Sequence, residues 1–269
     1  MAPSANDAPQ ISAWAQALVE RVGARQPFSA PWDDLSLSDG YRVQDEVRRL
    51  LEPERGPLAG YKVAITAKPL QDLLGIDHPL GGQVHAGQLR PSGVRLAASA
   101  FVGLALECEV TIRVGRDLPP ASVPYTRESI VPFVGELIVS FEVLDAREAA
   151  IAAMGASGLV ADRCACEGAV LGTATSDFAG LDLAGLGGFA CELEWNGEVV
   201  DRGVTGNAMG HPFEGLAWVA NHVIARGGQL RAGDVVLTGS AFAPRPASAG
   251  DRATYRIDGL GEVSVTVTA

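Results

Sequence analysis

From residue 60 onward the chain is a succession of short apolar runs that are separated by glycine and proline. Runs of this length are typical of strands, whereas helices need longer amphipathic segments. The expected strands are 61–66, 104–114, 137–144, 168–173, 187–195, 235–238 and 252–268. Because they outnumber the helices and do not alternate regularly with them, a doubly wound parallel sheet is disfavoured. The pattern favours a mixed, β-rich α+β fold.

Two helices are expected to interrupt these strands. The first follows Thr126, which is a suitable N-cap, and continues to Leu137. The second begins at His211-Pro212, with proline in its first turn, and ends before Gly227. His211 is therefore interpreted as a capping residue rather than as a catalytic base.

The N-terminal part of the chain has helical periodicity instead. Residues 11–22 place apolar side chains one helical turn apart. A second helix is expected after Ser38, a plausible N-cap, and Pro53 is expected to stop it. At about 150 residues per domain, a chain of 269 residues makes one large domain or two modest ones. We divide it into a leader and helical region, 1–58, and a β-rich region, 59–269.

The sequence lacks the features of an export signal or a membrane span. Residues 1–10 contain no lysine or arginine ahead of an apolar stretch, so we expect a leader and not a signal peptide. The longest uncharged apolar run, 96–106, is well short of the roughly 20 residues of a membrane helix. The four cysteines are therefore expected to be reduced, and the protein to be cytoplasmic.

The balance of charge argues against polyanionic partners. The chain carries 21 basic and 32 acidic residues, and its net charge of −11 repels nucleic acid and anionic lipid on average. The expected partner is a small molecule, with no nucleic acid and no membrane. Only two of the basic residues are lysines, Lys62 and Lys68, so amine chemistry has few candidates.

Three acidic residues occur inside two of the most apolar expected strands. Glu107 and Glu109 lie two residues apart, so they share one face of strand 104–114. Glu142 lies among the apolar residues of 137–144. Because unpaired buried carboxylates are costly, the three indicate a cation site, and oxygen ligands suit Mg²⁺ or Mn²⁺. The alternative for Glu107 and Glu109 is the solvent face of an edge strand.

Lys62 stands inside the expected strand 61–66, where burial would lower its pKa and suit it to hold a carboxylate or relay a proton. The alternative is a strand lysine whose ammonium reaches solvent. Lys68, which precedes Pro69, is expected on the surface. The sequence has no Gly-x-Ser-x-Gly, no His-Glu-x-x-His and no phosphate-binding glycine loop, which sets aside those classes of site.

Several short motifs follow one another in a distinctive order. They are Gly60-Tyr61-Lys62-Val63, Leu74-Gly75-Ile76-Asp77, Glu107-x-Glu109, Phe141-Glu142-Val143-Leu144-Asp145, Val160-Ala161-Asp162, Leu171-Gly172, Gly210-His211-Pro212 and 232–240. In this order they resemble the 2-keto-4-pentenoate hydratase and 4-oxalocrotonate decarboxylase branch of the fumarylacetoacetate hydrolase superfamily. The resemblance covers the chain from about residue 37 to its C-terminus.

The resemblance implies a fold and a set of site residues. The fold is a β-rich mixed sandwich or roll with a small N-terminal helical region, and the protein is a homo-oligomer. Region 59–269 is then the catalytic domain. The implied metal is Mg²⁺ or Mn²⁺, and the implied roles are metal ligation by Glu107, Glu109 and Glu142, and catalysis by Lys62 and Asp77.

The implied activity is the addition of water to a 2-hydroxydienoate or 2-oxo-enoate during the degradation of aromatic compounds. One alternative is decarboxylation of 4-oxalocrotonate, a 2-oxo-3-hexenedioate. The other is a catalytically silent subunit that binds a metabolite or an active relative. In each case the small partner is a 2-oxo acid, and a complex with a homologous decarboxylase or hydratase is a further implied assembly.

The chain departs from the family pattern at two places that shape the substrate pocket. After Ala161-Asp162 the family continues Asn-Ala/Thr-Ser, whereas this chain has Arg163-Cys164-Ala165 and lacks the hydroxyl group. In place of Gly-Ser-Leu-Thr it has Gly239-Ser240-Ala241-Phe242. We therefore expect Arg163, Ser240 and Phe242 to contact the substrate. An arginine facing the pocket would favour a dicarboxylic substrate, and the alternative is a surface arginine in a turn.

Overall fold

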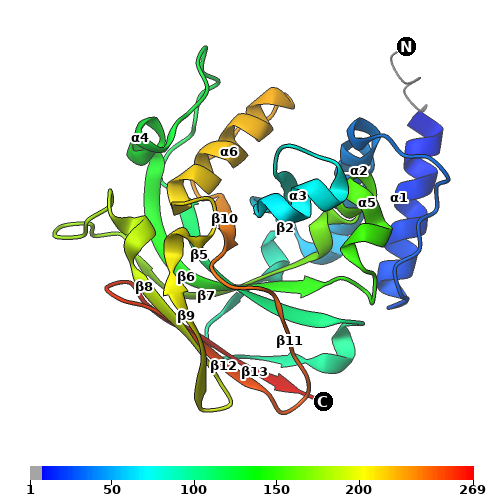
Figure 1. The fold of residues 1–269 in the computed structure, drawn as a ribbon. Helices are drawn as coiled ribbons and strands as arrows, with labels where there is room; N and C mark the ends of the chain where they lie inside the picture. The colour runs from blue at the N-terminus through cyan, green and yellow to red at the C-terminus, as the bar shows by residue number, and fades with distance from the viewer. Residues whose placement is uncertain (1–7) are drawn as a thin grey trace.

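The computed structural model describes residues 8–269, which form two β-sheets flanked by helices (Figure 1). The larger sheet has the order β2-β1-β10-β5-β6-β7-β3, with β11 paired to β5, and the smaller has the order β4-β13-β12-β8-β9. The strands are β1 (Leu58–Ala64), β2 (Leu80–His85), β3 (Leu89–Pro91), β4 (Val94–Ala97), β5 (Leu104–Val114), β6 (Val134–Asp145), β7 (Cys166–Thr175), β8 (Ala190–Trp195), β9 (Glu198–Val204), β10 (Val235–Ser240), β11 (Arg245–Pro246), β12 (Arg252–Ile257) and β13 (Gly261–Thr268). The predicted mixed, β-rich fold is confirmed.

The larger sheet is curled into a roll. β2 and β3 stand at opposite ends of its strand order, yet only residues 86–88 connect them. Because a residue spans at most about 3.6 Å, two strands joined by so short a segment must lie close together. Side chains from strands that are not neighbours in the sheet can therefore meet inside the roll.

The strand predictions are most accurate at the centre of the larger sheet. β5 has the predicted bounds, and β6, β7 and β10 extend their predicted segments by a few residues. The predicted segment 252–268 contains two strands, β12 and β13, with a turn between them. The strands β2, β3, β4, β9 and β11 were not predicted. β2 is fully buried, but two of its six residues are glycines, which weaken the strand pattern.

Six α-helices accompany the sheets in the described chain. They are α1 (Ala8–Gly23), α2 (Leu37–Arg55), α3 (Lys68–Leu74), α4 (Arg127–Ile130), α5 (Ile151–Ala161) and α6 (Pro212–Ala225). α1 begins inside the predicted leader, and residues 1–7 of that leader lie outside the described residues. α2 packs on both α1 and α5. The Gln44 side chain of α2 donates to the carbonyls of Gly81 and Val160, at 3.0 and 2.7 Å.

The helix predictions were wrong at several boundaries. α2 is capped by Ser36, whose Oγ accepts from the Asp39 amide at 3.0 Å, and not by Ser38. It also continues through Pro53 to Arg55, so the proline lies in the last turn instead of stopping the helix. After Thr126 the helix ends at Ile130, because the chain enters β6 at Val134 and pairs with β5.

Other helix predictions were confirmed or incomplete. His211 caps α6 as predicted, and its Nδ1 accepts from the Phe213 amide at 3.0 Å. α3 and α5 were not predicted. Lys68 begins α3 instead of lying in a loop, although its side chain is exposed as expected and pairs with Asp72.

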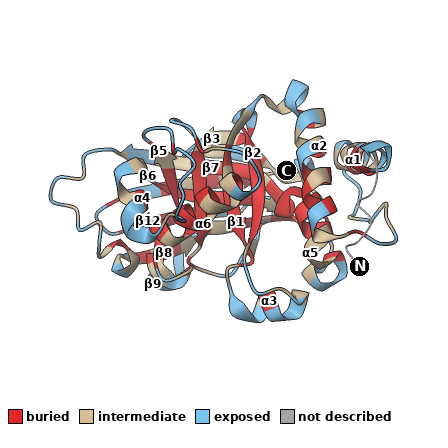
Figure 2. Ribbon diagram, turned by 90° about the horizontal axis from the view of Figure 1, so that it is seen from above, coloured by how far each residue is buried: buried red, intermediate tan, exposed pale blue. Residues whose placement is uncertain are grey.

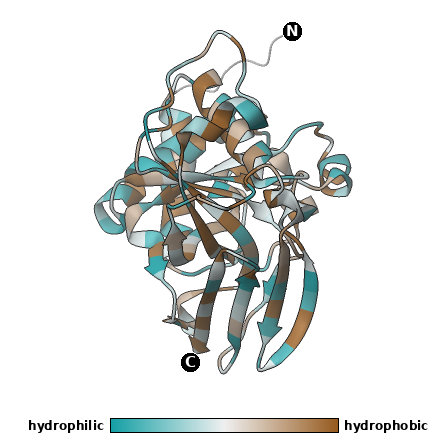
Figure 3. Cartoon of the chain, turned by 90° about the vertical axis from the view of Figure 1, so that its left-hand side faces the viewer, coloured by the Kyte–Doolittle hydropathy of each residue, from teal (hydrophilic) through white to brown (hydrophobic). Residues whose placement is uncertain are grey.

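The main core lies between the two sheets. Phe141 of β6 and Tyr255 of β12 meet there, with their ring centroids 6.1 Å apart. Figure 2 shows the buried residues gathered in the central strands and the exposed residues on the outer faces of the helices. Figure 3 shows hydrophobic and hydrophilic residues alternating along the strands, as expected for sheets with one face in the core. Within residues 8–269, none of the helices has the length and apolar character needed to cross a membrane.

Candidate active site

Three carboxylates meet on one face of the paired strands β5 and β6. Glu107 is directly opposite Glu142 in the register, and Glu109 is opposite Ser140. One oxygen of each of the three carboxylates lies within 4.8 Å of the others. β5 and β6 are central strands, and Glu109 and Glu142 are almost fully buried. The edge-strand alternative is therefore wrong, and the structure brings the three predicted metal ligands together.

Lys62 reaches this cluster from β1, on the other side of the roll. Its Nζ lies 2.8 Å from Oε1 of Glu142, and both side chains are buried. β10 and β5 separate β1 from β6 in the strand order, so the contact depends on the curl of the sheet. The alternative of a solvent-exposed lysine is wrong.

The electrostatics of the cluster favour the binding of another cation. Burial and the charge of Glu142 raise the pKa of Glu107 to about 7, although Lys62 opposes them. Burial and the charges of Glu142 and Glu107 raise the pKa of Glu109 well above its usual range, although Lys62 and the Gly239 amide oppose them. Burial lowers the pKa of Lys62, but Glu142 and Glu107 outweigh it and the net shift is upward. One ammonium therefore faces three carboxylates and cannot neutralise them.

A bulge in β10 supports Glu109 from the opposite side. The amide of Gly239 donates to Oε2 of Glu109 at 2.9 Å, at the point where the register between β10 and β5 shifts. Gly239 has a φ of 103°, a conformation that strains any residue with a Cβ. The other oxygen of Glu109 has no hydrogen-bond partner among the described residues. The donor set thus fits Mg²⁺ or Mn²⁺, which prefer oxygen ligands.

A cavity of about 500 Å³ extends from the carboxylates. Glu107, Lys62 and Gly239 line one end of it. Much of the remaining wall is apolar, and comes from β1, β5, β6, α5 and the segment after β10. The site therefore combines a charged end with a hydrophobic chamber, which is the usual composition of a small-molecule site.

Ser240 and Phe242 both line this cavity, as predicted for substrate-contacting residues. The Ser240 hydroxyl is already used, since it accepts from the Cys108 amide at 3.0 Å and donates to the Phe242 carbonyl at 2.7 Å. The Phe242 ring packs edge-on against Tyr255, with the centroids 6.1 Å apart. Ser240 therefore fixes the loop that carries the aromatic ring.

Arg163 does not line the cavity, and the expectation that it contacts the substrate is corrected. Its guanidinium is buried and pairs with Glu167 at 2.9 Å. Arg163, Cys164 and Ala165 have left-handed φ angles of 57°, 54° and 60°. This turn directs Cys164 and Ala165 toward the cavity and the arginine into an ion pair. Both sequence alternatives, a pocket arginine and a surface arginine, missed this third arrangement.

Asp77 lies outside the cavity. It is exposed in the segment between α3 and β2, where it borders a separate surface hollow with Asp72 and His78. The structure thus brings Lys62, the three glutamates, Ser240 and Phe242 together, but not Asp77 or Arg163.

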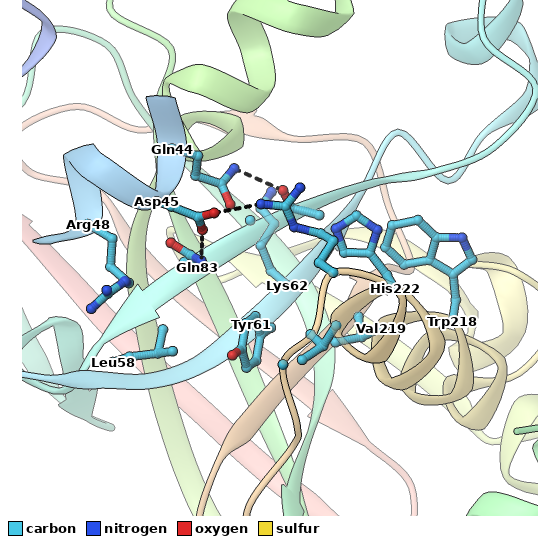
Figure 4. Close-up of a pocket in the computed structure, with 15 residues that line it drawn as sticks. Gln44, Asp45, Arg48, Leu58, Tyr61, Lys62, Gln83, Trp218, Val219 and His222 are labelled. Atoms are coloured by element: carbon cyan, nitrogen blue, oxygen red, sulfur yellow. Dashed lines mark hydrogen bonds and ion pairs between the residues drawn. The ribbon is translucent and has the colours of Figure 1, made fainter. Parts of the chain in front are cut away.

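A second cavity, of about 310 Å³, lies between α2, α6 and the strands β1 and β2 (Figure 4). Several of its polar groups pair with one another. Asp45 accepts from Gln83 at 2.8 Å and from Arg226 at 2.7 Å. His222 stacks on Trp218, and burial together with Arg226 lowers its pKa to about 4. Within the described residues, Glu107 of the acidic cluster lines the first cavity and no member of the cluster lines the second, so we assign the chemistry to the first.

Some residues of the site carried no sequence signal of their own. Ala105 and Leu144 are opposite each other in the register, one step beyond Glu107 and Glu142 on the same face, and both line the cavity. The alternation of β5 and β6 predicts this face once the acids are recognised. The support from Gly239 depends on a bulge and has no comparable signal.

Comparison with known proteins connects this site to a family. Residues 82–268 match the fumarylacetoacetate hydrolase C-terminal family, and this segment contains all three carboxylates. The chain belongs to the fumarylacetoacetate hydrolase family. The match begins after β1, so Lys62 lies outside the matched segment.

Relatives within the fumarylacetoacetate hydrolase family include two kinds of enzyme. The chain is 31% identical to 2-hydroxyhexa-2,4-dienoate hydratase of Comamonas testosteroni, with 90% of each chain covered. It is 30% identical to 2-keto-4-pentenoate hydratase 1 of Dechloromonas aromatica, with 93% of this chain and 94% of the relative covered. A 4-oxalocrotonate decarboxylase of Pseudomonas putida is 27% identical, over 87% of this chain and 86% of the relative. The resemblance to this branch is confirmed.

Solved structures agree with the fold. 4-Oxalocrotonate decarboxylase from Pseudomonas putida, complexed with magnesium and adipate, has a TM-score of 0.88 at 24% identity, covering 97% of this chain and 98% of that one. Fumarylpyruvate hydrolase from Pseudomonas aeruginosa, in complex with Mn²⁺ and pyruvate, has a TM-score of 0.57 at 21% identity, covering 77% and 88%. The first similarity extends over nearly the whole chain, including the N-terminal helices.

Proposed function

We propose that this protein is a metal-dependent hydratase that adds water to a 2-hydroxydienoate or the corresponding 2-oxo-enoate. The observation that carries the proposal is the cluster of Glu107, Glu109 and Glu142, with Lys62 beside it, at the charged end of a small-molecule cavity. The two hydratases that are at least 30% identical over most of the chain support it.

Glu107, Glu109 and Glu142 would hold Mg²⁺ or Mn²⁺. The related decarboxylase and fumarylpyruvate hydrolase structures are complexes with magnesium and with Mn²⁺, which agrees with the oxygen-only donor set here. When bound, the metal stabilises negative charge on the oxygens of a 2-oxo acid and so makes the conjugated double bond electrophilic. The donation from Gly239 fixes the orientation of Glu109, which leaves its second oxygen available to a cation.

Lys62 provides positive charge for an anionic substrate. Because Glu142 and Glu107 together outweigh the effect of burial on its pKa, Lys62 stays an ammonium at neutral pH. Its contact with Glu142 orients the Nζ toward the cluster. We therefore assign Lys62 to holding the carboxylate or the enolate oxygen of the substrate. The apolar wall opposite limits the access of bulk water to the reacting carbons.

The test is the loss of ultraviolet absorbance when purified protein and Mg²⁺ are mixed with a 2-hydroxydienoate. The proposal expects the conjugated absorbance to disappear, and Glu142→Gln to lose at least about 100-fold in rate. A matched control is Glu136→Gln, which changes a β6 carboxylate that pairs with Arg113. Full activity and full Mg²⁺ affinity in Glu142→Gln would refute the three-carboxylate site.

The same assay separates the alternatives. Release of CO₂ from a dienedioate without prior hydration indicates decarboxylation, the activity named in the Pseudomonas putida relative. No reaction with any dienoate, together with intact Mg²⁺ binding, indicates a silent subunit. Asp77→Asn in this assay decides whether the exposed aspartate takes part at all.

We also propose that the chain forms homo-oligomers, and that a complex with a homologous decarboxylase or hydratase is its other candidate assembly. The support is the family membership, because relatives of both kinds cover most of the chain. Light scattering after gel filtration, alone and with a relative of each kind, measures the mass directly. A mass of 27.9 kDa under all conditions would mean a monomer and exclude both assemblies.

A further inference from the structure

The far end of the cavity is built for an uncharged tail. On β5 and β6 the face that carries the acids continues with the pair Ala105 and Leu144, one step beyond Glu107 and Glu142. Two residues along a strand span about 7 Å, so this pair lies about that far from the carboxylates. A short alkyl tail beyond the oxo group of a bound 2-oxo acid covers this distance. The tail would therefore rest on alanine and leucine.

The walls around that tail are also apolar. Ile151 and Met154 of α5 border the cavity, and so does Phe242. Where the family pattern has a serine, Ala165 contributes only a methyl group. The neutral polar groups on the wall are few, and Asn207 already donates to the Ala241 carbonyl at 3.0 Å.

No cation is available at this end of the cavity. Among the described residues that line the cavity, Lys62 is the one basic residue, and it lies at the opposite, charged end beside Glu142. Arg163, the residue that the sequence offered for a distal carboxylate, is held by Glu167 and is absent from the wall. A second carboxylate on the substrate would be buried without a partner, which is strongly unfavourable.

From these contacts we propose that the cavity selects monocarboxylic 2-oxo acids and 2-hydroxydienoates with an apolar tail, and rejects dicarboxylic ones. The inference rests on the proposed hydratase function where it concerns the reaction. The preference for monocarboxylic over dicarboxylic acids rests on the cavity alone. The volume agrees, because about 500 Å³ falls within the roughly 300–1,000 Å³ of small-molecule sites and leaves room for a tail. Longer tails are therefore accommodated, and each added methylene should tighten binding about fourfold until the chamber is full.

The experiment compares 2-oxohexanoate with 2-oxoadipate, which differ only in a terminal methyl or carboxylate group. Calorimetry with the full-length protein and Mg²⁺ should show at least about 100-fold tighter binding of 2-oxohexanoate. Equal affinities, tighter binding of 2-oxoadipate, or no binding of either acid would overturn the inference. This measurement needs no turnover and no variant.

A matched pair of variants tests the position of the tail. Leu144→Arg places a cation beside the predicted tail and should improve 2-oxoadipate binding at least about tenfold, whereas Leu144→Met should keep the preference of the unaltered protein. No improvement of 2-oxoadipate binding in Leu144→Arg, when Leu144→Met keeps the preference of the unaltered protein, would contradict the assigned tail position. Turnover of 2-hydroxyhexa-2,4-dienoate and of its 6-carboxylate analogue is measured separately. If neither reacts, the hydratase function fails, while the calorimetric preference still decides the inference.

Discussion

Two clusters of buried charge in this protein have opposite characters. In the cavity, three carboxylates face the single ammonium of Lys62, and the pKa of Glu107 rises to about 7. Behind the turn at Arg163, Glu167 faces two arginines, Arg55 at 2.6 Å and Arg163 at 2.9 Å. Burial raises the pKa of Glu167, but the two arginines outweigh it and the net shift is downward. Glutamate carboxylates thus lack enough cationic partners in one cluster and are fully paired with arginines in the other.

The difference distinguishes a ligand-binding site from a structural ion-pair cluster. A buried cluster in which every carboxylate has a cationic partner contributes to holding the chain in place, whereas a cluster with more carboxylates than cations requires a further cation. Burial alone does not distinguish them, because both contain almost fully buried side chains. The sign of the pKa shift distinguishes them, because the shift is upward for Glu107 and downward for Glu167.

The cluster around Arg163 and Glu167 should matter most for stability. We expect Arg163→Met to lower the free energy of unfolding by about 3–5 kcal/mol, because Glu167 and Asp162 keep their burial and lose a partner. Urea denaturation measures the change. Arg95→Met, at an exposed position, is the control and should change stability by less than about 0.5 kcal/mol. A loss below about 1 kcal/mol for Arg163→Met would show that the ion pairs do not hold the turn.

The cluster of three carboxylates should behave in the opposite way. Glu107→Gln should raise the stability of the metal-free protein by about 1–3 kcal/mol at pH 8, because it removes a charge that burial disfavours. The same variant should bind Mg²⁺ at least about 100-fold more weakly. Denaturation in the presence of a chelator and titration calorimetry measure the two effects. Destabilisation of the metal-free protein by this substitution would mean that burial does not disfavour the charge of Glu107.

The pH dependence follows from the sign of the Glu107 shift. Its pKa is about 7 in the folded protein against an ordinary value of 4.5, so its contribution to stability is fully present below pH 4.5. That contribution is lost as the pH rises through 7. The stability difference between the metal-free protein and Glu107→Gln should therefore grow from pH 5 to pH 8. Mg²⁺ affinity should rise over the same interval, because protons and metal compete for the carboxylate. A stability difference that does not change between pH 5 and pH 8 would contradict the raised pKa of Glu107.

Lys62 should have a smaller, reversed effect on metal binding. At pH 9, where the carboxylates are ionised, Lys62→Met should bind Mg²⁺ severalfold more tightly, because a competing cation is removed from Glu142. Turnover of a 2-hydroxydienoate should nevertheless fall sharply. Lys68→Met changes the other lysine of the chain, which is exposed on α3, and should alter neither quantity. Weaker Mg²⁺ binding in Lys62→Met would mean that the ammonium organises the carboxylates instead of competing with the metal.

Local patterns predicted much of this site. Alternation along a strand placed Glu107 and Glu109 on one face, and the apolar neighbours of Glu142 indicated burial. The register that sets Glu107 opposite Glu142 could not be derived in the same way, because it depends on how two strands pair and not on either strand alone. The grouping of the three acids rested on the cost of burying unpaired carboxylates, and the resemblance to a family implied the same three ligands.

The errors came from interactions between distant segments. Arg163 was assigned to the pocket on its residue type, whereas its direction is set by a left-handed turn and by Glu167. The helix expected after Thr126 is cut short because β6 pairs with β5 from Val134 onward. Asp77 was placed by analogy, and the structure leaves it exposed. In each case tertiary contacts decided between local options of similar energy.

The curl of the larger sheet separates two events in the formation of the site. All three carboxylates lie on β5 and β6, which are consecutive and antiparallel, so pairing of these two strands is enough to assemble the acidic cluster. Lys62 arrives only when β1 has joined the sheet through β10, a partner about 175 residues later in the chain. The acidic cluster therefore depends on a local strand pairing, whereas the contact between Lys62 and Glu142 depends on a long-range one.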